Sequence, residues 1–458
     1  MPYLLNLVYL LLILAASPWL LYQAIRNGKY RRGYAQKLLG RVPRRTSQGP
    51  CIWLHAVSVG EVNLLAPLLK MIEQQRPGWE CVVSTTTLTG MSLARRKYPG
   101  LTVFYCPLDF TWAVGAAMRR IRPSLLVLAE LELWPNLVRA ARRHGARVAV
   151  INGRLSEHSY RGYRRIRPLA ARLLGQIDLV AVQDETYAER FAALGAAAGA
   201  VHVTGSMKFD GAETDRRNPA TERLRRLAGL RDDDVVLLAG STQEPEEAAA
   251  LETFRELSGA WPQLRLVLVP RHPERFHAVA RLLDQSGLAW RRRTELDSPP
   301  PHDHDHRAAG LVPAPTQRRD KPGGSAEARI LLVDVVGELG AWWGTAGIAF
   351  VGGSLGRRGG QNMIEPAAYG AAVSFGPNTR NFRDIVAMML ARRAAVVVED
   401  GEALTRFVRR CLEQPDDAAA LGDRARTLVT EQLGATRRTY TLLARLVEQP
   451  SGGTRAAA

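Results

Sequence analysis

A chain of 458 residues is too long for a single hydrophobic core, so the length favours two domains. A hydrophobic content of 46% predicts a globular body and excludes a disordered chain. The formal net charge of +18 suits an anionic substrate, an anionic membrane or nucleic acid. No two of the four cysteines form a CxxC motif, which argues against a zinc site or a disulfide framework.

The amino-terminal segment of residues 1–25 is uncharged and rich in leucine, and eight Lys and Arg residues without an opposing acid follow it up to residue 45. About 20 helical residues cross the apolar part of a bilayer, so this segment predicts a retained membrane anchor with its basic flank in the cytoplasm. A cleaved signal peptide fits less well because the positive charge follows the apolar run. Asn6 and Pro18 weaken a full span, so an interfacial helix stays open. In both cases the basic residues should contact anionic lipid head groups.

Apolar strand-like runs alternate with amphipathic helix-like runs in the rest of the chain, which predicts doubly wound parallel sheets. A polar stretch at 212–234 reads as a linker between two Rossmann-like domains at 26–211 and 235–448, with a cleft between them. The expected strands are 51–57, 81–84, 101–105, 124–129, 147–152, 179–182 and 201–204 before the linker, and 235–239, 264–270, 330–333, 348–352, 372–375 and 395–398 after it.

The stretch 294–328 is rich in Pro, His, Asp, Arg and Gly and predicts a disordered insertion in a surface loop. Its tract His302–His306 has alternating His and Asp residues that could bind a metal. A solvated polar tract explains the same composition, and we favour that interpretation.

Glu61 is the first acidic residue of the chain and follows an apolar run and a Ser-Val-Gly turn. This position corresponds to the carboxyl edge of a parallel strand, where open α/β sheets bind ligands. The spacing of Ser58 and Glu61 also matches a capping box, which would satisfy the first N–H groups of the next helix. The motif by itself leaves both roles open, a general base and a helix cap.

Polar residues follow several other strand-like runs. The segment 84–90 suits either anion binding or N-capping at a helix start. Glu130 and Glu132 follow the run 125–129, and two like charges there need a partner such as Arg154, Lys208 or a substrate cation. An acidic first turn of a helix is the alternative. Lys208 itself stands just after a strand-like run.

The second half repeats this pattern. Pro270 and Arg271 end a strand-like run, and the segment 336–338 follows another. The glycine-rich segment 352–360 precedes a helix whose free N–H groups suit a phosphate, and Glu365 in that helix could reach a ribose diol. The segment matches neither GxxxxGK[ST] nor a GxGxxG after the first strand, which argues against an ATPase and a dehydrogenase.

Seven segments resemble, in order, the 3-deoxy-D-manno-oct-2-ulosonic acid (Kdo) transferases of Gram-negative bacteria: HAVSVGE, STTTLTG, ELELWPN, INGRLS, VTGSMKFD, VPRHPERF, and FVGGS followed by GGQNMIEPAA. The resemblance covers almost the whole chain. It implies a GT-B glycosyltransferase without a metal or other cofactor. It also implies CMP-Kdo as donor and a tetraacylated lipid A precursor as acceptor, at the cell inner membrane, in lipopolysaccharide core biosynthesis.

The resemblance also implies roles for individual residues. Glu61 matches the catalytic base, and Glu130 and Lys208 match positions that stabilise the transition state. The expected CMP-contacting residues are Pro270, Arg271, Val336, Gly337, Glu338, Asn362, Met363, Ile364 and Glu365. The family often has Met where Val336 stands and His where Gln361 stands, so we expect the side-chain contacts at the nucleotide to differ in detail.

Two other classes of protein fit parts of the sequence. Another membrane-associated GT-B enzyme that uses a different nucleotide sugar is the nearer alternative. A non-enzymatic, membrane-tethered basic module that binds nucleic acid or acidic lipid is the other. A nucleic-acid surface needs aromatic residues interleaved with basic ones, and the chain shows no such stripe. We therefore expect no nucleic-acid partner.

Overall fold

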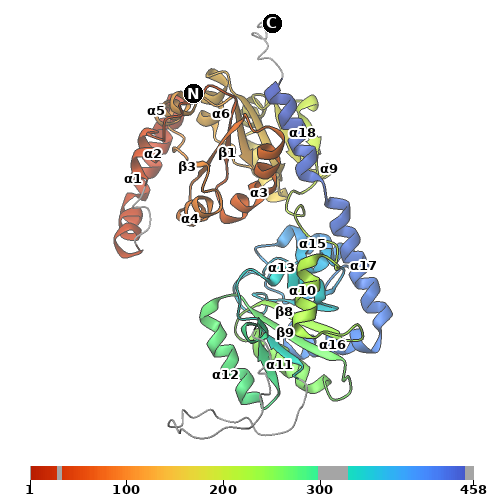
Figure 1. The fold of residues 1–458 in the computed structure, drawn as a ribbon. Helices are drawn as coiled ribbons and strands as arrows, with labels where there is room; N and C mark the ends of the chain where they lie inside the picture. Colours follow the sequence, from red (N-terminus) through yellow and green to blue (C-terminus); the bar gives the residue numbers. More distant parts are fainter. Residues whose placement is uncertain (1, 28–32, 298–327, 449–458) are drawn as a thin grey trace. The chain divides into compact units, whose positions relative to one another are not determined.

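The computed structural model describes residues 2–27, 33–297 and 328–448, and it divides into two compact units. Unit 1 contains residues 1–211 and 432–458, and unit 2 contains residues 212–431. Within the described residues, each unit is built on a seven-stranded sheet in which all paired strands are parallel (Figure 1). The alternation of apolar and amphipathic runs predicts this type of sheet.

The sheet of unit 1 has the order β3-β2-β1-β4-β5-β6-β7. Its strands are β1 (Cys51–His55), β2 (Glu80–Thr85), β3 (Thr102–Tyr105), β4 (Leu125–Ala129), β5 (Arg147–Gly153), β6 (Leu179–Val182) and β7 (Val201–Val203). The helices are α1 (Pro2–Asn27), α2 (Tyr34–Leu39), α3 (Val59–Gln75), α4 (Leu88–Lys97), α5 (Thr111–Ile121), α6 (Pro135–Arg143), α7 (Glu157–Arg165), α8 (Arg167–Leu174), α9 (Glu185–Ala193), the short η1 (Ala198–Ala200) and α18 (Ala435–Glu448).

Successive residues of the unit 1 strands face two apolar cores. Ile52 and Leu54 of β1 belong to the core under α3, α4 and α18, whereas Trp53 belongs to the core under α5, α6 and α9. Because side chains alternate across a strand, a strand with helices on both faces must be apolar at every position. The unbroken apolar runs in the sequence are therefore the strands of this sheet.

The last helix of the described chain, α18, packs on unit 1 beside α3 (Figure 1). Ala435, Tyr440 and Leu443 join the apolar core on that face of the sheet. Asp210 accepts a hydrogen bond from the Gly434 N–H at 2.7 Å, which fixes the start of this helix. We expected the second domain to extend to residue 448, but residues 432–448 belong to unit 1. An amphipathic helix fits any apolar face, so its periodicity does not say which sheet it covers.

The amino-terminal helix α1 docks on unit 1 through Asn6. This side chain donates to the Thr111 hydroxyl at 2.7 Å and accepts from the Thr111 N–H at 3.1 Å, and only 6% of the residue is exposed. The Tyr9 hydroxyl donates to Asp109 at 3.2 Å. Among the described parts of the chain, no helix has both the length and the apolarity of a bilayer span. The predicted spanning anchor is therefore not supported by the structure.

One residue of the predicted lipid-facing basic segment is buried. Arg45 is 8% exposed, and its guanidinium donates to Glu80 at 2.6 Å and to the carbonyl oxygen of Arg122 at 3.4 Å. Its charge is used inside the fold and is not available to a lipid head group. Arg41 and Arg44, in contrast, are exposed.

The sheet of unit 2 has the order β10-β11-β9-β8-β12-β13-β14. Its strands are β8 (Val235–Thr242), β9 (Leu264–Pro270), β10 (Trp290–Arg292), β11 (Ile330–Leu332), β12 (Ile348–Val351), β13 (Ala372–Phe375) and β14 (Val396–Val397). The helices are α10 (Pro219–Ala228), α11 (Glu246–Leu257), η2 (Pro273–Arg275), α12 (Phe276–Ser286), η3 (Arg293–Asp297), α13 (Leu339–Trp342), η4 (Trp343–Thr345), α14 (Ile364–Ala368), α15 (Arg383–Ala391), α16 (Gly401–Glu413) and α17 (Pro415–Gln432).

The predicted linker 212–234 is an ordered part of unit 2. It contains α10, and the Thr221 hydroxyl on that helix donates to the Ala341 carbonyl at 3.0 Å. Arg216 donates to the carbonyl oxygens of Tyr369 at 2.7 Å and Ala346 at 2.8 Å. Polar side chains that suggested a linker instead form hydrogen bonds with backbone carbonyl groups of unit 2.

Most of the predicted insertion 294–328, including the tract His302–His306, lies outside the described residues. Its first residues, however, are ordered in η3. The Thr294 N–H and hydroxyl donate to the carboxylate of Asp334 at 3.0 and 2.8 Å. Residues 294–297 of the predicted insertion are therefore ordered.

Candidate active site

In unit 1, the predicted catalytic carboxylates lie on both sides of the point where the strand order reverses. β1 lies between β2 and β4 in the sheet, so the connections after β1 and β4 leave in opposite directions. Glu61 follows β1 in the first turn of α3, and Glu130 follows β4 directly. Open α/β sheets bind ligands at this position, outside the carboxyl ends of the strands.

Glu61 occupies the position of a helix cap. The Ser58 hydroxyl accepts from the Glu61 N–H at 3.3 Å and donates to Glu61 Oε1 at 2.7 Å, and Oε2 accepts from the Val57 N–H at 2.8 Å. Burial raises the pKa of the Glu61 carboxyl, and these hydrogen bonds oppose the rise. These contacts are the ones expected if Glu61 belongs to a helix cap. Each carboxylate oxygen has a second lone pair, so capping does not exclude a role as base.

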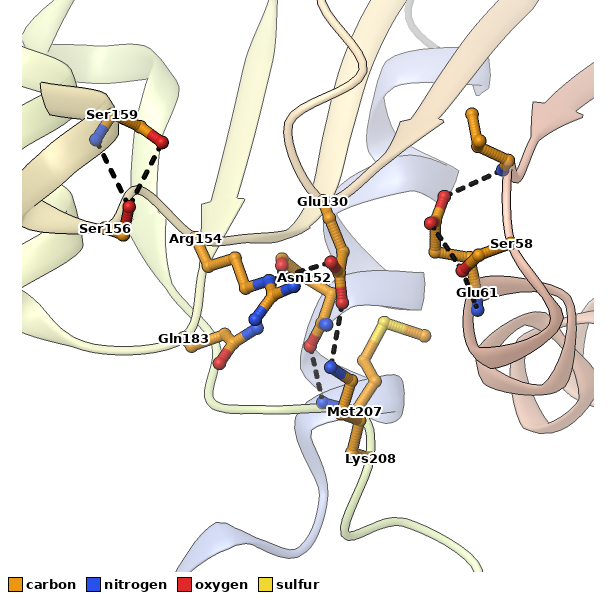
Figure 2. Close-up of polar contacts among 11 residues, drawn as sticks. Ser58, Glu61, Glu130, Asn152, Arg154, Ser156, Ser159, Gln183, Met207 and Lys208 are labelled. Atoms are coloured by element: carbon orange, nitrogen blue, oxygen red, sulfur yellow. Dashed lines mark hydrogen bonds and ion pairs between the residues drawn. The ribbon is translucent and has the colours of Figure 1, made fainter. Parts of the chain in front are cut away.

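Glu130 forms ion pairs with two cationic side chains (Figure 2). Lys208 Nζ lies 2.9 Å from Oε1, and Arg154 Nε lies 2.7 Å from Oε2. Both partners that the sequence suggested for this carboxylate are present. The Arg154 and Lys208 side chains remain 41% and 31% exposed, so the cluster can still meet an anion. Glu130 has a φ of 56°, a left-handed conformation that is costly for a non-glycine residue and often occurs at functional sites.

Asn152 connects the segments that hold the two cations. Its side-chain oxygen accepts from the Met207 N–H at 3.0 Å, next to Lys208, and its carbonyl accepts from the Gln183 side chain at 3.1 Å (Figure 2). The residue is fully buried and has a φ of 51°. Sequence reasoning missed this role of Asn152 and Gln183. The available signal was a polar residue at the end of an apolar strand-like run, two positions before Arg154.

Glu132 differs from Glu130 in its surroundings. It accepts from the indole N–H of Trp134 at 3.1 Å. Burial, and then the negative charge of Glu61, raise its pKa to about 7. Like charges in one site disfavour simultaneous ionisation, so this carboxyl holds its proton at higher pH than an exposed glutamate does. The two glutamates that the sequence treated as a pair therefore have separate environments.

In unit 2, the predicted nucleotide-contacting residues all lie at or after the carboxyl ends of strands of the same sheet. β8 lies between β9 and β12, so the reversal point of this sheet lies at the ends of those strands. Pro270 ends β9 and Arg271 follows it, and the segment 362–365 comes after the loop that follows β12. The Arg271 N–H donates to the Thr242 carbonyl at the end of β8 at 3.0 Å. The Arg271 side chain is exposed.

The segment 336–338 follows β11, the neighbour of β9 on the other side. Val336 is 73% exposed, and Gly337 has a φ of 99°. Glu338 receives two hydrogen bonds from the buried Arg293, Nε to Oε2 at 2.9 Å and Nη2 to Oε1 at 2.8 Å. The carboxylate of Glu338 is therefore engaged within the protein, and sequence reasoning missed Arg293.

Within the segment 362–365, polar and apolar side chains have different tasks. The Asn362 side chain donates to Glu365 Oε1 at 2.9 Å and accepts from the Ile364 N–H at 3.1 Å. Burial raises the pKa of Glu365, and the positive charge of Arg271 opposes the rise, so these two groups influence each other. Met363 and Ile364 are buried, so their backbone rather than their side chains is what a ligand can meet.

Two observations concern other sites. Among the residues that the structure describes, no group of three or more His, Cys, Asp or Glu side chains is arranged to hold a metal ion. An open hollow of about 1060 Å³ in unit 2 lies along α11 and α16, lined by residues such as Glu252, Glu399 and Arg406. None of the predicted site residues lines that hollow.

The fold agrees with a solved glycosyltransferase from Rickettsia africae ESF-5, with a TM-score of 0.51, 11% identity and coverage of 88% of this chain and 100% of that one. The two parallel-sheet units thus share their fold with that glycosyltransferase. The 3-deoxy-D-manno-octulosonic acid transferase of Haemophilus influenzae is 31% identical over 96% of this chain and 98% of its own. That of Bordetella pertussis is 31% identical over 95% and 98%. The family model described as 3-deoxy-D-manno-octulosonic-acid transferase (kdotransferase) matches residues 30–211. The chain belongs to this family.

Proposed function

We propose that this protein transfers Kdo from CMP-Kdo to a tetraacylated lipid A precursor during lipopolysaccharide core biosynthesis. The observation that carries the proposal is the similarity to Kdo transferases over nearly the whole chain. The net charge of +18 agrees with it, because the donor and the acceptor are both anionic. In this proposal unit 1 binds the acceptor and unit 2 binds the donor, as in other GT-B enzymes.

In the proposed reaction, an acceptor hydroxyl oxygen forms a bond to the anomeric carbon of Kdo. The bond from that carbon to the CMP phosphate oxygen breaks, CMP leaves from the opposite face, and the configuration inverts. Glu61 takes the hydroxyl proton as general base. Its raised pKa makes it a stronger base than an exposed glutamate. The hydrogen bonds from Ser58 and Val57 fix the carboxylate and leave a lone pair on each oxygen.

The departing CMP carries the negative charge that develops in the transition state. Lys208 and Arg154, held by Glu130, supply positive charge for this purpose in unit 1. Prearranged charges of this kind commonly give the largest share of a rate enhancement. These cations can provide the charge neutralisation that a metal ion provides in other transferases.

The nature of the donor separates this function from that of another nucleotide-sugar GT-B enzyme. CMP should raise the thermal unfolding midpoint, because a ligand stabilises the state that binds it, and UDP should leave it unchanged. Mass spectrometry should then detect Kdo on the lipid precursor after incubation with CMP-Kdo. Stabilisation by UDP alone, with no transferred Kdo, would support the other nucleotide sugar.

We also propose that α1 attaches unit 1 to the inner leaflet of the cell inner membrane, where the acylated acceptor lies. Leu7, Leu11 and Leu14 on this helix are 53%, 56% and 69% exposed, although each is a large apolar side chain. Apolar side chains on an exposed helix favour insertion among lipid acyl chains. The exposed Arg41 and Arg44 fit the anionic head groups.

Replacing Leu11 and Leu14 together by glutamine should lower co-sedimentation with phosphatidylglycerol vesicles by about tenfold or more, because the apolar area of both side chains would no longer enter the acyl region. Leu88→Gln is the matched control, since Leu88 is 53% exposed on unit 1 but lies on α4. Unchanged sedimentation of the double variant, with loss of binding only after replacement of Arg41 and Arg44, would assign membrane binding to the basic residues instead.

A further inference from the structure

The first turn of α11, at the end of β8, contains two adjacent buried carboxylates. Glu246 is 0% exposed and Glu247 is 1% exposed. An ionised carboxylate is costly to bury unless hydrogen bonds or an opposite charge compensate it. Each of these side chains is compensated by a different segment of unit 2, and both segments lie next to residues expected to bind the donor.

Glu246 binds the backbone of the glycine-rich loop that follows β12. Its Oε2 accepts from the N–H groups of Gly353 at 2.7 Å and Gln243 at 2.9 Å. Its Oε1 accepts from the N–H groups of Ser354 at 2.8 Å and Leu355 at 2.9 Å. One carboxylate thus accepts hydrogen bonds from three consecutive N–H groups of the loop. This arrangement resembles an anion-binding nest in which the Glu246 side chain is the bound anion.

The packing around this carboxylate leaves little space. A Cβ atom at Gly352 would lie 2.7 Å from Glu246 Oε2, so only glycine permits the close approach. The Ser354 hydroxyl donates to the Val351 carbonyl at 2.6 Å and accepts from the Gly376 N–H at 2.8 Å. The loop is therefore fixed to the ends of β12 and β13 as well as to α11.

Glu247 holds the segment that follows Arg271. It receives two hydrogen bonds from Arg275, Nε to Oε1 at 3.0 Å and Nη2 to Oε2 at 3.0 Å. Such two-point pairs between arginine and a carboxylate fix geometry as well as charge. Arg275 ends the short helix η2, which begins two residues after Arg271.

We propose that Glu246 and Glu247 are positioning residues for donor binding. Glu246 holds the loop 353–355 and Glu247 holds the segment 271–275 in the geometry that the nucleotide meets. The identity of the donor in this inference rests on the proposed function. The hydrogen bonds by which Glu246 and Glu247 hold these two segments do not depend on it. Because Glu246 already occupies the amides of 353–355, the donor phosphate takes its N–H donors from elsewhere in unit 2.

The test compares Glu246→Gln and Glu247→Gln with Glu252→Gln, an exposed position on the same helix that pairs with Arg255. Hydrogen exchange of the full chain should rise about tenfold or more at the amides 353–355 in the first variant, because glutamine has one acceptor oxygen and no charge, and its NH2 group would face N–H donors. The same amides should stay protected in the second variant, with faster exchange near 275. Both variants should raise the donor KM about tenfold and leave the acceptor KM unchanged.

Unchanged hydrogen exchange at the amides 353–355 in Glu246→Gln would show that Glu246 does not hold this loop. Faster exchange with an unchanged donor KM overturns the positioning role and leaves the proposed function intact. Absence of Kdo transfer by the wild-type protein would contradict the proposed function. Hydrogen exchange alone would then test whether Glu246 and Glu247 hold the segments 353–355 and 271–275. If Glu246→Gln does not fold, Glu246→Asp serves instead, since it keeps the charge but its side chain is one methylene too short to reach all three amides, which should then exchange faster.

Discussion

Replacing Glu61 by glutamine should lower kcat for Kdo transfer by about 10²- to 10⁴-fold, the usual contribution of a positioned general base. The fold should survive, because glutamine can accept from the Val57 N–H with its oxygen and donate to the Ser58 hydroxyl with its nitrogen. Glutamine cannot, however, take up a proton. Initial rates at saturating CMP-Kdo and lipid precursor, with thermal unfolding of the same sample, measure both effects.

The pH dependence gives an independent test of the same residue. Because burial raises the pKa of Glu61, the wild-type rate should fall as the pH decreases through that raised pKa and the base becomes protonated. This acidic limb should be missing in Glu61→Gln. Ser58→Ala is the control for the helix cap, and it should cost about 1 kcal/mol of stability with a smaller loss of rate. A near wild-type rate in a folded Glu61→Gln protein would remove Glu61 as the base.

Glu130 and Lys208 should act as one unit. Glu130→Gln and Lys208→Met should each lower kcat by about 10²- to 10³-fold, a typical loss for a prearranged charge in a transition state. Lys208 Nζ lies 2.9 Å from Glu130 Oε1, so the loss of either group changes the position or the charge of the other. The double variant should therefore be no slower than the slower single variant. Single-turnover rates of the four proteins complete the double-mutant cycle.

A surface ion pair in the same unit provides the control. Arg142 Nη1 lies 2.6 Å from Asp178 Oδ2, and the Arg142 side chain is 41% exposed. Arg142→Gln should change kcat by less than about twofold, because exposed pairs contribute little. If the losses of Glu130→Gln and Lys208→Met multiply in the double variant, the two residues act independently and the shared role is wrong.

The strands were largely readable from the sequence. The run 125–129 was expected as a strand and forms β4, because a strand covered by helices on both faces is apolar throughout. The strand β10 was missed. It consists of Trp290, Arg291 and Arg292, and its edge position leaves two of its three side chains outside the core. A short polar edge strand gives no apolar run by which it could be recognised.

Parts of the candidate site were also readable. Arg154 and Lys208 were named as candidate partners because two like charges at Glu130 and Glu132 need compensation, and Glu130 forms ion pairs with both. The cap at Glu61 followed from local spacing alone. Local spacing could not reveal that Arg45 is buried against Glu80, since the two residues are distant in sequence and Arg45 lies in a loop.

Two parallel sheets, polar residues at their carboxyl ends and the resemblance to Kdo transferases could all be inferred from the amino-acid sequence, because periodicity and motif order are properties of neighbouring residues. The three-dimensional structure was needed to show that α18 covers unit 1, that Asn6 binds Thr111, and that Glu246 accepts hydrogen bonds from the amides of 353–355. Those contacts join segments about a hundred or more residues apart. Which buried groups compensate one another depends on which distant segments the fold brings together, and no local sequence pattern contains that information.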